Sequence, residues 1–175
     1  MTQNFNLIDF NNYFSALSNS IILGIIVGIG CVCFSIFINY VSRFTKSNWV
    51  NFYKKIINLG YALPGVVIAL GVLVLINLFD LYSPILLSTS LFGVVLALII
   101  RLISISNNSL QSGLEKIGKS IDDASRLIGR RSSTTYFRII IPQIKLSILA
   151  GFFLVLIDTI KELPITLLLR PFNFN

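Results

Sequence analysis

Four long apolar runs constrain the fold of this chain more than any other feature of its sequence. They cover residues 21–41, 61–79, 85–103 and 144–160. About 20 helical residues, each rising about 1.5 Å, cross the roughly 30 Å hydrocarbon core of a bilayer. Charged residues make up only 12% of the chain, about half the share that is typical of soluble domains. The sequence therefore predicts an all-α, polytopic bundle of about four transmembrane spans.

The basic residues gather in two of the segments between these runs and predict the orientation of the chain. Residues 42–60 contain Lys and Arg but no acid, and residues 104–142 contain more bases than acids. The turn at 80–84 and the N-terminal arm contain no basic residue. Because Lys and Arg are retained in the cytoplasm, we expect the loops 42–60 and 104–142 inside and the N-terminus outside. We expect Arg101, near one end of the third run, to snorkel to the inner interface.

The loop 104–142 carries the signals of two short helices. Ser120 and Asp123 have the spacing of a capping box, and Gly129 suits a left-handed stop after the helix. A second helix is expected up to Ile141, with Pro142 as its boundary. Apolar residues recur at intervals of three or four and form one stripe: Ile117, Ile121, Ala124 and Ile128. This stripe is expected to bury itself in the groove of a partner or, alternatively, in the surface of the inner leaflet.

The spacing within this loop resembles a motif of the inner-membrane permeases of binding-protein-dependent ABC importers. That motif reads Glu-Ala-Ala, three residues, Gly, nine residues, then Ile-x-Leu-Pro. This chain keeps every interval, with Asp for Glu, Ser for the second Ala and Ile for Leu. The resemblance implies that the loop is the coupling loop that docks on a cytoplasmic ATPase. The docking residues that it implies are Asp123, Ala124, Ser125, Gly129, Ile139 and Pro142.

Two further segments narrow the resemblance to ferric-iron permeases. Residues 61–71, which include Leu-Pro-Gly, and residues 161–174, which begin Lys-Glu-Leu-Pro, look like the C-terminal half of the fused, two-module type. The resemblance therefore implies transport of ferric iron through a pathway that this chain helps to form. Permeases for thiamine, sulfate or polyamines share parts of the first segment, and another small solute of this kind is the alternative.

The resemblance covers nearly the whole chain as a single permease domain, residues 1–175. The family's module continues with one more span, so we expect this domain to be incomplete at its C-terminus. A non-transporting, truncated membrane remnant is a further alternative. Residues 1–19 lack the Lys and Arg of a signal peptide, so the first apolar run is expected to remain in the mature protein.

The resemblance also implies a multi-pass protein of the bacterial inner membrane that works in an assembly. The implied partners are cytoplasmic ABC ATPase subunits, a second permease module and a periplasmic or surface substrate-binding protein, all meeting in membrane lipid. The chain is not expected to be an enzyme or to hold a cofactor, because it has no His and no Gly-rich phosphate loop. Nucleic acid is not an expected partner, because a loop held by spans at both ends would not lay a helix in a major groove.

Three residues are candidates for the pathway through the membrane. Pro64, near the start of the second run, marks either a kink or a tolerated first helical position. Asp158 and Glu162 lie one helical turn apart, and carboxylates at membrane depth are costly and often functional. They are expected either to line the path of a cation or to be satisfied by Lys161, Arg170 or interfacial water. No metal-ligand cluster is evident, so substrate recognition is expected to rest with the binding protein.

Overall fold

The structure is a computed structural model that describes residues 10–45, 48–82 and 91–169. In these ranges all regular structure is helical, which confirms the predicted all-α class. Three helices pack against one another and form the centre of the bundle: α1 (Phe10–Phe44), α4 (Phe92–Glu115) and α8 (Lys145–Lys161). The first, third and fourth apolar runs of the sequence thus pack together in the bundle.

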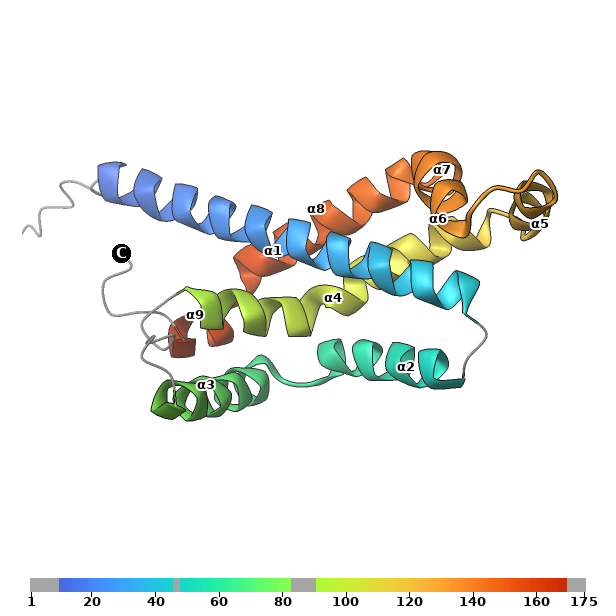
Figure 1. The fold of residues 1–175 in the computed structure, drawn as a ribbon. Helices are drawn as coiled ribbons and strands as arrows, with labels where there is room; N and C mark the ends of the chain where they lie inside the picture. Colours follow the sequence, from blue (N-terminus) through green and yellow to red (C-terminus); the bar gives the residue numbers. More distant parts are fainter. Residues whose placement is uncertain (1–9, 46–47, 83–90, 170–175) are drawn as a thin grey trace, which may run out of the picture.

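Two helices cover the side of α4 that faces away from this centre. α2 (Asn48–Ala62) and α3 (Gly65–Tyr82) follow one another along α4, separated by a break at Leu63 and Pro64 (Figure 1). The short helix α9 (Leu163–Leu169) follows α8 and packs on α3. Most of the basic connection at 42–60 is therefore helical: α1 runs on to Phe44, and α2 begins four residues later at Asn48.

The number of candidate membrane spans agrees with the prediction. α3, α4 and the part of α1 from Phe14 onward are each long and apolar enough to cross a bilayer. The helical segment Ser132–Gln143 and α8 form a fourth candidate, bent by 72° at the break between them. The first residues of the third apolar run, 85–90, lie outside the described residues.

α4 continues well beyond the apolar run that predicts it. The run ends at Ile103, but the helix ends at Glu115 and so includes much of the predicted loop. Two polar side chains of this extension form hydrogen bonds to neighbouring helices. The Asn39 Nδ2 of α1 donates to the Asn107 Oδ1 at 2.9 Å, and the Ser109 hydroxyl donates to the Ser147 carbonyl of α8 at 2.8 Å. Hydrogen bonds of this kind hold helices together where water is excluded.

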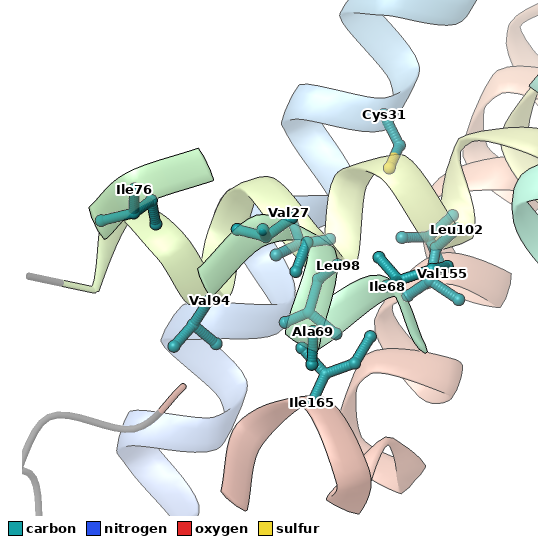
Figure 2. Packing of buried hydrophobic residues seen from close by; sticks show 12 residues of the cluster. Val27, Cys31, Ile68, Ala69, Ile76, Val94, Leu98, Leu102, Val155 and Ile165 are labelled. Atoms are coloured by element: carbon teal, nitrogen blue, oxygen red, sulfur yellow. The ribbon is translucent and has the colours of Figure 1, made fainter. Parts of the chain in front are cut away.

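The main hydrophobic core lies where α1, α3, α4, α8 and α9 meet. Figure 2 shows its side chains, which come from all five helices: Val27, Cys31, Ile68, Ala69, Ile76, Val94, Leu98, Leu102, Val155 and Ile165. α4 supplies the centre of this core, because it contacts each of the other four helices. The core therefore fixes α4 as the element around which the rest of the chain is arranged.

A second, smaller core lies at the end of the bundle that carries the predicted coupling loop. It joins the last turns of α1 and α4 to the segment before α8, through Leu114, Tyr136, Ile140 and Ile144. The Tyr40 and Tyr136 rings pack edge to face, with centroids 5.2 Å apart. The coupling loop is therefore packed onto the bundle rather than suspended from its two ends.

The segment before α8 differs from the prediction that its helix ends at Ile141. It comprises α6 (Ser132–Thr135), a π-helical turn η1 (Tyr136–Ile140) and α7 (Ile141–Gln143), and the break comes only at Ile144. Pro142 has no N–H to donate to the carbonyl four residues earlier, so the preceding turn widens. The Ile141 N–H accordingly bonds to the Tyr136 carbonyl, five residues back.

Candidate functional site

The short helix α5 (Ser120–Leu127) projects from one end of the bundle, at the right of Figure 1. Its polar side chains Asp122 and Ser125 are buried against the bundle, whereas Leu127 is 89% exposed and the following Ile128 is 76% exposed. Of the predicted apolar stripe, Ala124 and Ile128 are exposed, whereas Ile117 and Ile121 are half-buried and Ile117 packs on the second core. Exposed apolar side chains next to one another give a surface suited to a partner.

The predicted capping box at the start of α5 is wrong. Lys119 is the residue before the helix, and its backbone is itself helical, with φ −64° and ψ −18°. Ser120 is therefore inside the first turn, where its hydroxyl cannot take the capping position, and α5 has no side-chain cap. The predicted stop is present: Gly129 has φ +75°, the left-handed conformation that other residues adopt only at a cost.

Arg43, the last basic residue of α1, holds the inner face of α5. Its Nε donates to the Asp122 Oδ2 at 2.8 Å, and the side chains of the pair are only 10% and 9% exposed. The other nitrogens of the guanidinium donate, at 3.4 Å each, to the carbonyls of Leu114, Ile117 and Gly118. These carbonyls lie at the end of α4 and in the link to α5, and those of Leu114 and Gly118 also accept from the backbone N–H groups of Ile117 and Ile121.

A second attachment joins α5 to the segment that follows it. The hydroxyls of Ser125 and Thr135 lie 2.5 Å apart, and both are buried. One residue further on, the buried Tyr136 donates its hydroxyl hydrogen to the Ile36 carbonyl of α1 at 3.0 Å. α5 is therefore fixed on both sides, to α1 and α4 through Arg43 and to α6 through Ser125.

A half-buried ion pair lies at the two helix breaks within the bundle. The Arg101 Nε of α4 is 3.2 Å from the Glu162 Oε2, which follows α8, and the side chains are 18% and 12% exposed. The Arg101 Nη1 also donates to the Leu63 carbonyl, at 2.8 Å, in the break between α2 and α3. Gly65 makes room for the pair, because a Cβ there would meet the Glu162 Oε1.

This geometry corrects two expectations. Arg101 does not reach along α4 toward Glu115; it lies in the first half of the helix, where its partners are the Glu162 carboxylate and the Leu63 carbonyl. Glu162 is paired with this arginine rather than with Lys161. Arg170, the other expected partner, lies outside the described residues. Pro64 belongs to the same arrangement, since it breaks the α2–α3 line and so frees the Leu63 carbonyl.

Asp158 faces an open groove between α2, α4 and α8. The groove has a volume of about 690 Å³. Its lining combines apolar side chains, Ile105, Leu146, Ala150 and Leu154, with hydroxyl and amide side chains: Asn58, Tyr61, Ser104, Asn108, Ser109, Ser112 and Ser147. Polar side chains along one line of a membrane helix are the usual lining of a hydrophilic path. Among the described residues, no three His, Cys, Asp or Glu side chains lie close enough to hold a metal ion.

Comparison with known proteins supplies the family. Residues 21–171 match the family described as binding-protein-dependent transport system inner membrane component. The chain belongs to this family. Over 167 residues it is 28% identical to the Fe(3+)-transport system permease protein FbpB 2 of Haemophilus influenzae. The matched region covers 92% of this chain and 31% of that protein. The chain thus spans about a third of the length of the curated relative that it matches.

In this inner-membrane component the six motif residues do not share one surface. Asp123, Ala124, Gly129 and Pro142 are exposed, whereas Ser125 is buried and Ile139 is half-buried. Ser125 is instead one of the attachments that hold α5 in place. The motif therefore combines residues that face outward with residues that fix the shape of the loop.

Sequence reasoning did not find two of the arginines that organise this permease-family chain. Arg43 meets Asp122, 79 positions away, and nothing in the local sequence signals that contact. Arg101 was expected at the membrane edge, because its contact with Glu162 is also distant in the sequence. The polar groove had a local signal, since Ser104, Asn108 and Ser112 recur every four residues and so share one face of a helix.

Proposed function

We propose that this chain is the permease subunit of an ATP-driven importer and that α5 docks on a cytoplasmic ATPase. The observation that carries the proposal is the exposed apolar face of α5, with Ala124, Leu127 and Ile128 directed away from the bundle. Burying a large aliphatic side chain stabilises a contact by about 1.5–3 kcal/mol. Leu127 at the end of α5 and Ile128 directly after it would each contribute to such a contact.

The substrate we propose is ferric iron. The support is the 28% identity to an Fe(3+)-transport system permease over nearly the whole chain. The proposed pathway follows the groove at Asp158. Pro64 and Glu162 do not line this groove: Glu162 is paired with Arg101 and lines a separate pocket with residues of α1, α8 and α9. A substrate-binding protein selects and delivers the ion, and a second permease module closes the pathway.

The proposed coupling is mechanical. Closure of the ATPases on ATP moves α5, and the bundle shifts between two packings that open the groove to one side of the membrane or the other. The chain supplies the surface and the path, and the ATPases supply the free energy.

Docking is tested by recovery of the ATPase from membranes with the tagged full chain carrying Leu127→Asp. The expected result is loss of most of the ATPase, because a carboxylate would be buried in an apolar groove. Ser133→Asp is the matched control, since Ser133 is exposed in the same loop and lies outside α5. Recovery of the ATPase with Leu127→Asp at the level of the control would contradict docking through α5.

The substrate is tested in cells that produce the complete transporter. Labelled ferric iron is expected to accumulate only when the chain and the ATPase are both present, and unlabelled thiamine, sulfate or spermidine is expected not to compete. Competition by one of these solutes would assign that solute to the pathway in place of iron.

A further inference from the structure

We propose that Arg43 is the positioning residue that transmits movement of α5 to the membrane helices α1 and α4. The inference rests on the proposed function, because it requires an ATPase that moves α5. It concerns the inner face of α5, which carries the buried Asp122 and Ser125, rather than the face that exposes Leu127.

One side chain joins three elements at this point. Arg43 comes from α1, Asp122 from the first turn of α5, and the Leu114 carbonyl from the last turn of α4. The Ile117 and Gly118 carbonyls, which also accept from Arg43, lie in the link between α4 and α5. The guanidinium is planar and carries five N–H groups in a fixed fork, so it can hold acceptors from several directions at once.

Apart from Arg43, the link between α4 and α5 is restrained by backbone hydrogen bonds at its two ends and by the packing of Ile117 on the second core. It spans residues 116–119 and contains Gly118, which any side chain would stiffen. On the other side of α5, Gly129 is exposed and has no other residue's atoms within 4 Å of where its Cβ would be. A push on α5 that was not passed through Arg43 would bend these two links instead of moving α1 and α4.

The second attachment of α5 reaches α1 only indirectly. The Ser125–Thr135 hydrogen bond joins α5 to α6, and the next residue, Tyr136, donates to the Ile36 carbonyl of α1. Both are contacts between neutral groups, whereas Arg43 and Asp122 form a charge-assisted bond, which is about twice as strong. The direct route from α5 to the ends of α1 and α4 therefore runs through the guanidinium.

The test uses the complete transporter in proteoliposomes and compares ATP hydrolysed with iron transported. With Arg43→Gln, the ATPase is expected to remain bound and to hydrolyse ATP, while iron transported per ATP falls about tenfold, within the range of allosteric coupling. Lys116→Gln is the matched control, because Lys116 is an exposed basic residue of the same link, and it is expected to transport normally.

A second variant keeps the test informative if Arg43→Gln folds poorly with Asp122 left as a buried, unpaired charge. Arg43→Gln combined with Asp122→Asn removes that charge, and it is expected to restore the amount of assembled complex but not the coupling. Transport per ATP at the wild-type level in this double variant would overturn the proposal. So would a loss of ATPase binding, since Arg43 would then shape the docking surface only. A wild-type complex that neither binds the ATPase nor transports would instead overturn the proposed function.

Discussion

At the scale of single residues, the main feature of this membrane chain is the pairing of charged side chains inside the bundle. Arg101 and Glu162 lie between helices, with side chains only 18% and 12% exposed, and each compensates the charge of the other. Arg101 also satisfies a carbonyl that Pro64 leaves free, so the cost of the helix break and the cost of the buried cation offset one another.

This pairing predicts an asymmetry between single and double variants. Glu162→Gln is expected to lower the free energy of unfolding by about 3 kcal/mol, because it leaves Arg101 charged and unpaired. Arg101→Gln with Glu162→Gln is expected to cost less than Glu162→Gln alone, since no unpaired charge remains. The measurement is unfolding of the purified chain in mixed micelles against the fraction of denaturing detergent. Glu115→Gln, at an exposed position of α4, is the control, and equal stability of all three variants would rule out a buried pair.

At the scale of elements, α4 is the helix whose length and role the apolar runs predict least well. Its first half packs in the main core, and its second half places Ser104, Asn108 and Ser112 along the groove that Asp158 faces. Hydropathy alone assigned that second half to a loop, because it responds to mean polarity and not to which face is polar. A helical period of polar residues beside an apolar run is the better signal for such a continuation.

The groove predicts a pattern of reactivity along α4. In a Cys33→Ser background, which leaves the buried Cys31, Asn108→Cys is expected to react with a charged, water-soluble thiol reagent in sealed membrane vesicles. Ile100→Cys is expected to react little, although Ile100 is 41% exposed, because an apolar position outside the groove faces lipid, where a thiolate does not form. The mass shift of each variant gives the extent of reaction. Equal labelling at the two positions would contradict the proposal that the groove is an aqueous path.

At the scale of the whole molecule, the sequence predicted those features that depend on local pattern. The class of fold, the number of candidate spans and the left-handed turn at Gly129 follow from apolar length and residue type, and the structure agrees with them. The contacts of Arg43 and Arg101 depend on which helices become neighbours, and that is decided by the packing of the whole chain. The family motif singled out the loop that is expected to dock on the ATPase, but it did not indicate that Ser125 is buried.

The exposed side chains of Leu127 and Ile128 also bear on how the cell handles this subunit before assembly. Until the proposed partner covers them, they expose the same feature by which chaperones and proteases recognise unfinished proteins. We therefore expect the chain to be degraded faster when the ATPase is absent, and Leu127→Ser with Ile128→Ser to lengthen its half-life only in that case. A pulse–chase measurement in cells with and without the ATPase checks this, and a half-life independent of the ATPase would contradict it. The surface that makes the subunit useful would then also set the ratio in which the two proteins accumulate.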